Sequence, residues 1–569
     1  MKKIVRINMA SGETSMENLS GEYAGLGGRG LTSTIVAREV PPLCHALGPQ
    51  NKLVVAPGLL AGTSCINCGR LSIGAKSPLT GTIKESNVGG TVAQRLGQLQ
   101  IAALVFEQHA PADKPFYLLV NHEGTTLHPA DDLKGLKTYD TVQRLRTKHG
   151  DRVGVAAIGP VGEMRLATAS VAVSDRDGHA SRHAGRGGMG AVMGSKGLKA
   201  IVVDAVEAPG VEYQDREAFK AAAKILRTAI VENEATAPKT GSQALYSMNA
   251  IMAPVNELGG FPTRNFTRGK FADVRKIDGD ALHDTIKARG GVLNHSGCSN
   301  CIIQCSNVFV DPEGQYVTSA LEYETLFALG ANCDIGDLDA VARMDRLCDE
   351  YGIDTMETGC SIALAMEAGV VPFGDTEGAI GLLHEIGQGT PLGRILGNGA
   401  AMTGQAYGLH RIPVVKRQAF PGYDPRVLKG LGVTYASSPM GADHTAGFAA
   451  ELTAADMNPE GRVALSLETQ VFMAFLDSIG LCMAVLDGAT DENGGIAAMV
   501  PMVNAVYGWD INAENYGRAV LKTERAFNTA AGFTPQDDRL PEWLHTEPLP
   551  PNNTVFDVSY EEMDAAMKL

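Results

Sequence analysis

The sequence lacks several features that would mark particular classes of protein. No stretch reaches about 18 consecutive apolar residues, the length that a membrane-spanning helix needs. The N-terminus, MKKIVRINMASGE, has no sustained apolar segment, so we expect no secretory signal peptide and a cytoplasmic location. Positive charge is scarce, because the formal net charge is −15. This deficit argues against nucleic acid as a partner.

The composition is that of an ordinary globular protein. The 569 residues are 44% hydrophobic and 20% charged, and a chain of this length is expected to divide into two to four domains. Ten cysteines without an export signal indicate reduced thiols and metal sites rather than a disulfide framework. Many of the 66 glycines precede residue 200. They predict that the backbone of this region lies close to a ligand or to another part of the chain.

The pattern of apolar residues predicts an α+β multidomain protein with a β-rich N-terminal domain followed by two mostly helical domains. We place the domains at residues 1–208, 209–412 and 413–569, with the second boundary in the Pro-containing stretch 409–424. Strands are predicted within 51–58, 102–107, 116–121, 152–159 and 199–205. Helices are predicted within 216–234, 337–352, 355–369 and 462–477, the first with an apolar stripe of Phe219, Ala222, Ile225 and Ile230.

Three cysteines, Cys298, Cys301 and Cys305, form a C-x2-C-x3-C run in the segment GCSNCIIQCSN. The spacing does not fit a zinc ribbon, whereas three close thiolates and one distant thiolate often hold a [4Fe–4S] cube. Cys482 follows a Gly turn, so we predict it as the fourth ligand. A structural zinc site and unligated core thiols are the alternatives. Three other candidates, Cys333, Cys348 and Cys360, lie in or near helical patterns and are expected in the core.

A short motif occurs twice, as DEYGID at 349–354 and DSIGLC at 477–482. Each follows an amphipathic helix, and its Gly is suited to end that helix. The Asp carboxylate can accept two parallel hydrogen bonds from a planar N–C–N edge. One such motif indicates only a helix end, but two of them suggest paired sites for two similar ligands.

Taken together, these motifs resemble the aldehyde ferredoxin oxidoreductase family, and the resemblance runs from RINMASGE (6–13) to DDRLPEWLHTEPLP (537–550). Its most specific segments are GRLSIGAKSPLTGTIKESNVGG (69–90), SDRDGHASRHAGRGGMGAVMGSKGLKAIVV (174–203) and LEYETLFALGANCDIGDL (321–338). The resemblance implies that two sheets cradle a tungsten or molybdenum ion between two pterin cofactors, beside a [4Fe–4S] cluster.

The resemblance also implies roles for particular residues. It assigns the cluster to Cys298, Cys301, Cys305 and Cys482, and a Mg²⁺ ion that joins the cofactor phosphates to the backbone carbonyls of Asn87 and His183. Besides Cys482, the residues that it implies for pterin binding are Arg70, Asn87, Gly89, Arg182, His183, Gly185, Asp349, Ile353, Asp354, Asp477, Leu481 and Met483.

The glycine-rich loop GRGGMGAVMGSK (185–196) matches neither a dinucleotide fingerprint nor a P-loop. It is either a tight turn that feeds a strand or, beside Arg182 and Arg186, a phosphate cradle. The resemblance favours the cradle.

Glu324 and His444 match the carboxylate and the histidine of the family's active site. We predict that Glu324 takes the proton of an attacking water and that His444, titrating near neutrality, donates to a substrate carbonyl. Glu322 is the competing carboxylate and is expected nearby as a support. An isolated Glu or His is more often a surface group or a satisfied core group.

Some positions depart from the family pattern. Cys65 and Cys68 form an additional C-x-x-C, which is either core packing or a redox or metal site. Ala446 occupies the position of a pterin-contacting lysine. Arg343 and Arg346 replace residues that bind an interfacial iron in some dimeric relatives, so we expect an oligomer without that iron.

The sequence therefore predicts a tungsten or molybdenum enzyme that oxidises an aldehyde to a carboxylic acid. Its electrons would pass through the cluster to ferredoxin or a partner subunit. Three alternatives are a reductase of aromatic thioesters with the same fold, a non-catalytic electron-transfer or assembly subunit, and a zinc-stabilised structural protein.

Overall fold

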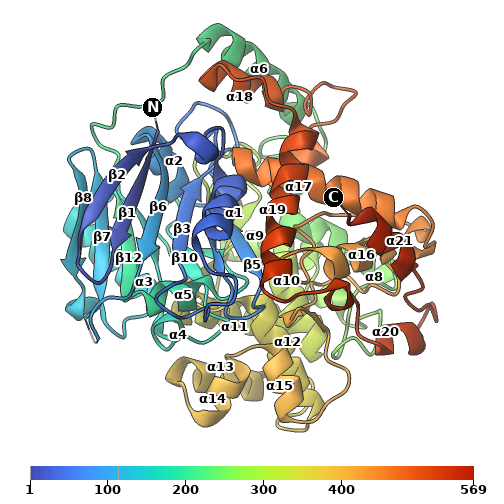
Figure 1. The fold of residues 1–569 in the computed structure, drawn as a ribbon. Coiled ribbons are helices and arrows are strands. Elements are labelled where there is room, and N and C mark those ends of the chain that lie inside the picture. The colour runs from blue at the N-terminus through green and yellow to red at the C-terminus, as the bar shows by residue number, and fades with distance from the viewer. Residues whose placement is uncertain (1, 113, 569) are drawn as a thin grey trace.

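The computed structural model describes residues 2–112 and 114–568. Two six-stranded sheets form the N-terminal part and helices form most of the remainder, which confirms the predicted fold class (Figure 1). The first sheet contains β1 (Lys3–Asn8), β2 (Thr14–Asn18), β3 (Leu53–Pro57), β4 (Leu71–Lys76), β5 (Ile83–Val88) and β6 (Ile101–Glu107). The second contains β7 (Phe116–Asn121), β8 (Gly124–Pro129), β9 (Gly154–Ala157), β10 (Val171–Val173), β11 (Arg182–Ala184) and β12 (Leu198–Val203).

The two sheets have the same topology. The strand order is β2-β1-β6-β3-β4-β5 in the first sheet and β8-β7-β12-β9-β10-β11 in the second. In each sheet the first and sixth strands of the unit are parallel neighbours. The helices also correspond, because α1 (Gly28–Glu39) and α2 (Val92–Gln98) occupy the places that α3 (Thr138–His149) and α5 (Met189–Ser195) occupy in the second unit. The N-terminal part is therefore a structural duplication, which the sequence did not reveal.

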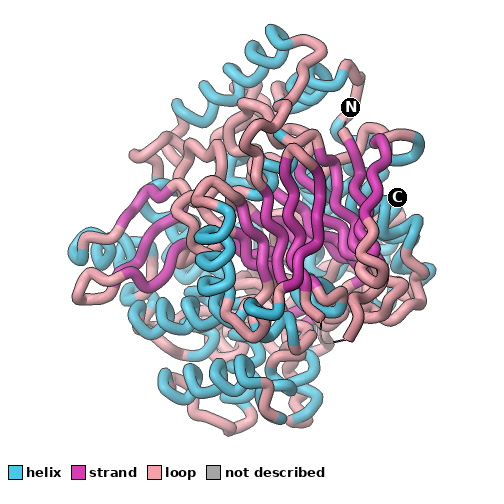
Figure 2. The backbone as a smooth tube through the Cα atoms, turned by 90° about the vertical axis from the view of Figure 1, so that its left-hand side faces the viewer, coloured by secondary structure: helices cyan, strands magenta, loops and turns pink. Residues whose placement is uncertain are grey.

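Successive side chains of each strand point to opposite faces of the sheet, and this alternation forms the layers of the N-terminal part. Ile201 and Val203 of β12 face the other sheet and join the core between the sheets, whereas Ala200 and Val202 pack on the outer face under α3. On the outer face of the first sheet, α1 supplies Ile35 and neighbouring apolar residues. Figure 2 shows most of the strands together in the middle of the molecule, with helices above and below them.

The predicted helices are present as α6 (Arg216–Val231), α11 (Leu338–Tyr351), α12 (Thr355–Glu367) and α17 (Arg462–Ile479). One detail of the predicted stripe on α6 is wrong, because Ile225 is 46% exposed and Leu226 is buried instead. The buried face packs against α18 (Met499–Tyr507), which lies beside α6 at the top of Figure 1. The other helices of at least six residues are α8 (Met252–Leu258), α9 (Gly279–Arg289), α13 (Thr376–Gln388), α14 (Pro391–Leu396), α15 (Ala400–Ala406), α16 (Lys429–Ser437), α19 (Ala513–Ala530) and α21 (Tyr560–Ala566).

A small antiparallel sheet interrupts the helical part. It contains β13 (Val292–His295), β14 (Ser306–Val310) and β15 (Tyr316–Ser319). The three clustered cysteines lie in the connection between β13 and β14. The main helical core includes Ile362 and Leu431, from either side of the predicted boundary at 413. The domain limits therefore stay a prediction.

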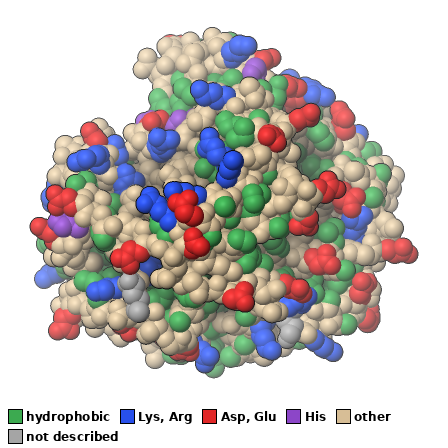
Figure 3. Space-filling model, turned by 90° about the horizontal axis from the view of Figure 1, so that it is seen from above, with side chains coloured by type: hydrophobic (Ala, Val, Ile, Leu, Met, Phe, Trp, Pro, Cys, Tyr) green, Lys and Arg blue, Asp and Glu red, His purple; other side chains and the backbone are tan. Residues whose placement is uncertain are grey.

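The surface carries charged side chains of both signs (Figure 3). Acidic and basic side chains are interspersed over the face shown in Figure 3. Within residues 2–112 and 114–568, no helix combines the length and the apolar character needed to cross a membrane.

Candidate active site

Residues of the sheets and of the helical part together enclose a cavity of about 700 Å³. Every predicted site residue lines it, although these residues come from segments far apart in the sequence. They are Arg70, Asn87, Gly89, Arg182, His183, Gly185, Cys298, Cys301, Cys305, Glu324, Asp349, Ile353, Asp354, His444, Asp477, Leu481, Cys482 and Met483. Their individual roles stay predictions.

Each repeated motif forms the predicted glycine-capped helix end. Gly352 ends α11 with φ 71° and Gly480 ends α17 with φ 84°, both in the left-handed region. Each turn packs directly on the N-terminal part. A Cβ atom on Gly159 would lie 2.2 Å from the carbonyl oxygen of Tyr351, and one on Gly58 would lie 2.2 Å from the Cα atom of Gly480. Glycine is therefore required where each helix end meets its sheet.

The two motifs dock on the duplicated units through equivalent backbone hydrogen bonds. The N–H groups of Arg70 and Ser170 donate to the carbonyls of Gly480 and Gly352, at 3.3 and 2.9 Å. Two residues further along each motif, the N–H of Cys482 donates to the carbonyl of Asn67 and the N–H of Asp354 donates to the carbonyl of Thr168, both at 2.9 Å. The duplication of the sheets therefore explains the repeat of the motif.

The two motif carboxylates have different partners. Asp349 receives a hydrogen bond from the Tyr139 hydroxyl at 3.3 Å and lies 3.0 Å from Nε2 of His183. Asp477 lies 3.4 Å from Arg29, the second residue of α1, just as Tyr139 is the second residue of α3. Burial, followed by the Glu85 carboxylate, raises the pKa of Asp477 to about 7. The two halves of the cavity are thus chemically distinct.

The four predicted cluster thiols share one part of the cavity. Cys298, Cys301 and Cys305 lie between β13 and β14, and Cys482 follows the turn at Gly480. No three His, Cys, Asp or Glu side chains among the described residues are close enough together to bind a single metal ion. The other candidate ligands are fully buried in the helical core and do not line the cavity; they are Cys333, Cys348 and Cys360.

Several groups at the cavity fit a bulky ligand that is rich in hydrogen-bond acceptors. Nε of Arg182 is buried and finds no hydrogen-bond partner among residues 2–112 and 114–568. A Cβ atom on Gly89 would lie 2.4 Å from the sulfur of Cys298 and 3.2 Å from the Arg70 guanidinium. Beside Gly185, by contrast, the nearest atom to such a Cβ is an Asp354 oxygen at 3.7 Å. These observations fit both a cluster and a pterin cofactor.

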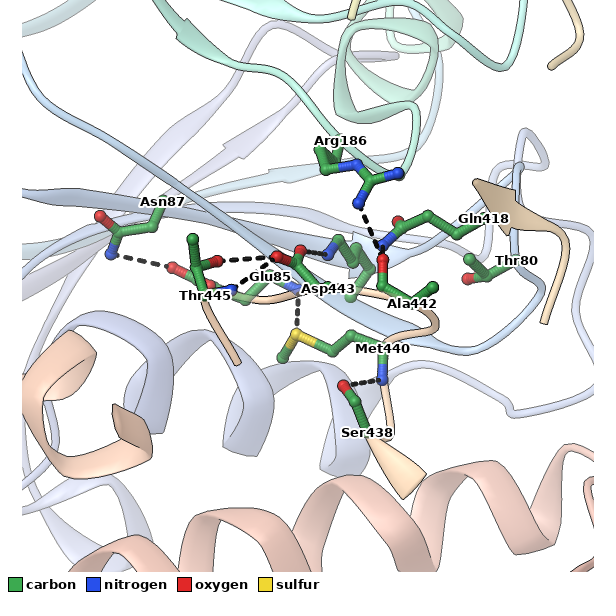
Figure 4. A network of polar contacts seen from close by, with 12 residues as sticks. Thr80, Glu85, Asn87, Arg186, Gln418, Ser438, Met440, Ala442, Asp443 and Thr445 are labelled. Carbon is green, nitrogen blue, oxygen red and sulfur yellow. Dashed lines mark hydrogen bonds and ion pairs between the residues drawn. The ribbon is translucent and has the colours of Figure 1, made fainter. Parts of the chain in front are cut away.

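The glycine-rich loop enters helix α5 and does not feed a strand directly. Arg186 in this loop is buried and donates to the carbonyls of Ala442 and Ala419, at 2.8 and 2.5 Å. It also lies 3.4 Å from the Asp354 carboxylate. Figure 4 shows that Arg186 and Gln418 converge on the carbonyl of Ala442. Arg186 therefore fixes the segment that leads to His444.

Glu324 and His444 lie side by side. Oε1 of Glu324 is 3.4 Å from Nδ1 of His444, and neither atom has a hydrogen-bond partner in the part of the chain that the structure describes. The other carboxylate oxygen of Glu324 accepts from the N–H of Gly422 at 2.9 Å. Burial raises the pKa of Glu324 to about 8 and lowers the pKa of His444 to about 4. The expectation that His444 titrates near neutrality is therefore wrong, because its burial disfavours the charged imidazolium.

Glu322 lines the cavity on the side of the thiols. Its carboxylate is buried and interacts electrostatically with Arg182 and Cys305. This location separates Glu322 from the Glu324–His444 pair.

Aromatic side chains form a wall beside His444. The ring of Tyr423 lies 5.3 Å from that of His444 and 5.4 Å from that of Phe448. Tyr323 stacks on Tyr423 at 4.8 Å and fixes its orientation. Tyr423 and Phe448 line the cavity together with Leu452.

The positions that depart from the family pattern have identifiable surroundings. Cys65 and Cys68 are fully buried outside the cavity, and Cys68 donates to the carbonyl of Cys65 at 3.0 Å. The two cysteines pack in the core. Asn67, which lies between them in the sequence, contacts Cys301 and Cys482. Sequence reasoning did not identify Asn67 as a site residue. The only signal was its position between two cysteines and close to Arg70.

Ala446 also lines the cavity, as does a nearby lysine on a different element. Lys84 of β5 is almost fully buried and lies 3.2 Å from the Asp443 carboxylate. On the outer surface of α11, Arg346 lies 3.6 Å above the ring of Tyr139 and Arg343 pairs with Glu377.

Comparisons with known proteins match this chain to one family along nearly its whole length. The family described as aldehyde ferredoxin oxidoreductase, N-terminal domain, matches residues 4–205, and its domains 2 and 3 match residues 220–567. The tungsten-containing aldehyde ferredoxin oxidoreductases of Pyrococcus horikoshii and Thermococcus kodakarensis are 33% and 32% identical, over 96% of this chain and 92% of theirs. The WOR-like subunit of the Pyrococcus furiosus aliphatic sulfonate oxidoreductase is 25% identical, over 92% of this chain and 85% of its own.

Among solved structures, the active site complex BamBC of benzoyl coenzyme A reductase, in complex with 1,5 dienoyl-CoA, has a chain with the same fold. The TM-score is 0.82 over 99% of this chain and 92% of that chain, at 20% identity. Since the two family descriptions together span almost the whole sequence, the chain belongs to the aldehyde ferredoxin oxidoreductase family.

Proposed function

We propose that this protein oxidises an aldehyde to a carboxylic acid, using a tungsten bis-pterin cofactor and a [4Fe–4S] cluster. The observation that carries this proposal is the Glu324–His444 pair at 3.4 Å, in the same cavity as both carboxylate motifs and four thiols. When bound, the metal cofactor supplies a Lewis acid and an acceptor for two electrons.

The chain offers groups for each part of the cofactor. Asp349 and Asp477 would accept hydrogen bonds from the N–H groups of the two pterin rings. Arg70 and Arg182 would donate to pterin and phosphate oxygens. A Mg²⁺ ion would bind the carbonyls of Asn87 and His183, which are equivalent positions in the two units because Leu71 pairs with Val88 as Val171 pairs with Ala184.

Glu324 would accept the proton of water as the water adds to the aldehyde carbon. The reaction converts aldehyde and water to carboxylic acid, two electrons and two protons. His444 is neutral at pH 7, so it acts as a hydrogen-bond donor to the carbonyl oxygen and does not transfer a full proton there. Gly422 orients the Glu324 carboxylate through its N–H.

The wall next to this pair supports a substrate with a ring or a bulky alkyl group. Tyr423 and Phe448 present apolar ring surface beside His444. An aromatic aldehyde can pack on these rings while its carbonyl faces Glu324 and His444.

The test combines metal analysis with a substrate screen. Protein purified without oxygen is analysed for tungsten, molybdenum, iron and zinc, and then assayed for reduction of a viologen dye by aldehydes and for reduction of aryl thioesters. Tungsten, iron and aldehyde-dependent dye reduction are expected. Zinc alone in a colourless protein would contradict the proposal, as would activity confined to thioesters. Cofactor without either activity would indicate an electron-transfer or assembly subunit.

The physiological partner is proposed on the same basis. Electrons would leave the cluster for ferredoxin or for an electron-transfer subunit. The cytoplasmic location and an oligomer without interfacial iron stay predictions.

A further inference from the structure

Asn67 connects the two segments that carry the cluster thiols, the β13–β14 connection and the turn that ends in Cys482. Its backbone N–H donates to the carbonyl of Asn300, between Cys298 and Cys301, at 2.9 Å. Its backbone carbonyl accepts from the N–H of Cys482 at 2.9 Å. One residue therefore holds the distant thiol in register with the other three.

The side chain of Asn67 makes two further contacts. Its amide nitrogen lies 3.5 Å from the sulfur of Cys301 and is placed to donate to it. Its amide oxygen accepts from the N–H of Ile302 at 3.2 Å. Asn67 is only 4% exposed and lines the cavity, so these contacts lie at the cavity wall and away from the outer surface.

Comparison of the two units distinguishes the backbone hydrogen bond of Asn67, which both units have, from its side-chain hydrogen bond to a thiol. Thr168 is its equivalent in the second unit and accepts the same backbone hydrogen bond, from Asp354 where the first unit has Cys482. The Thr168 side chain, however, donates to the carbonyl of Gly397, and among the described residues it makes no hydrogen bond to a sulfur. The backbone hydrogen bond is thus common to both units, whereas the side-chain hydrogen bond to a sulfur is made only in the unit that lies beside the thiols.

We propose that Asn67 is a positioning residue of the [4Fe–4S] site that also raises the reduction potential of the cluster. The proposal rests on the cluster of the proposed function. An N–H donor beside a ligand sulfur stabilises the additional negative charge of the reduced cluster, which makes reduction easier. The same residue keeps Cys482 within reach of the cube through its backbone carbonyl.

The backbone of Asn67 decides which variants are informative. Its φ is 55°, in the left-handed region, so alanine would strain the chain and confound the result. Asn67→Gly keeps this conformation and both backbone hydrogen bonds while removing the amide. Asn67→Asp keeps an oxygen to accept from Ile302 but cannot donate to Cys301 when ionised.

Asn300→Gly is a matched control. Asn300 also has a left-handed backbone, with φ 57°, and lies in the same group of loops. Its amide donates to the carbonyls of Thr63 and Cys65, at 3.1 and 3.2 Å.

The experiment is an anaerobic redox titration of the full-length protein, followed by electron paramagnetic resonance of the reduced cluster, with iron measured in parallel. Both Asn67 variants are expected to keep four irons per cluster and to titrate at a more negative potential than the wild type and Asn300→Gly. Equal potentials in Asn67→Gly, the wild type and the control would overturn the inference. Wild-type protein without iron would instead overturn the cluster of the proposed function.

Discussion

The Glu324 carboxyl and the His444 imidazole lie 3.4 Å apart, and their surroundings disfavour the charged form of each group. Burial raises the pKa of Glu324 to about 8 and lowers that of His444 to about 4, so both groups are predominantly neutral at pH 7. A carboxyl with a pKa near the working pH is suited to exchange a proton with water.

Replacement of Glu324 by Gln should remove turnover and leave the cofactors in place. The amide keeps the size of the side chain but cannot accept a proton, so kcat should fall by roughly 100-fold or more. Dye reduction by aldehyde gives the rate, and metal analysis gives the tungsten and iron content. Glu322→Gln serves as the control. Full activity in Glu324→Gln would remove its assigned role.

The pH dependence of kcat/KM should follow the raised pKa of Glu324. Because the ionised form is the base, activity should rise as the pH increases through about 8 and should level off above it. Titration of His444, with a pKa of about 4, should leave no step near neutrality. Rates measured between about pH 6 and about pH 9.5 test this. An optimum below pH 7 would contradict the assignment of Glu324 as the base.

Loss of the Cys482 thiol should damage the cluster although Cys482 is far in sequence from the other three. Cys482→Ala should lower iron content and weaken the visible absorption of the cluster. Cys360→Ala is the matched control, because Cys360 is fully buried in the helical core away from the cavity. Iron analysis and absorption spectra compare the two, and equal iron in both variants argues against Cys482 as a ligand.

Phe448→Ala should change substrate preference more than it changes chemistry. Removing this ring takes apolar surface from the wall beside His444, so kcat/KM for benzaldehyde should fall roughly tenfold relative to acetaldehyde. The ratio of the two kcat/KM values is the measurement. An unchanged ratio would show that the substrate does not contact Phe448.

Lys84 is expected to supply the positive charge that is missing at Ala446. Burial tends to raise the pKa of Asp443, but Lys84 and other nearby cations lower it, so Lys84→Met leaves this buried carboxylate poorly compensated. Tungsten content should fall in Lys84→Met and recover when Ala446→Lys is added. Lys199→Met is the control, since Lys199 is also buried and paired with one carboxylate, Glu163, away from the cavity. No recovery in the double variant would show that the two positions are not interchangeable.

Much of the architecture could be predicted from local sequence patterns. The strands near Leu53, Ile101 and Leu198 and the helices near Leu338 and Arg462 follow from apolar periodicity and turn residues. Among the candidate site residues, the four cluster cysteines and the motif residues Asp349 and Asp477 were predicted from local spacing, whereas the others were implied by the family resemblance. The structure then places all of them at one cavity.

What could not be predicted depends on contacts between distant segments. The pKa of His444 reflects burial by the whole surrounding structure, and Ile225 is exposed because α18 covers a different face of α6. The duplication is visible in strand order and in glycines such as Gly58 and Gly159, but these are too few to register as a sequence repeat. Asn67 belongs to none of the motifs that identified the other site residues.

Asp354 and Cys482 occupy equivalent positions in the two repeated motifs, but their side chains differ in chemistry. If both turns carried the same residue, the two halves would offer equivalent routes for electrons that leave the proposed metal cofactor. A thiol at one turn and a carboxylate at the other break that symmetry, so the proposed cluster, and with it the proposed exit for electrons, lies on the side of the first unit alone.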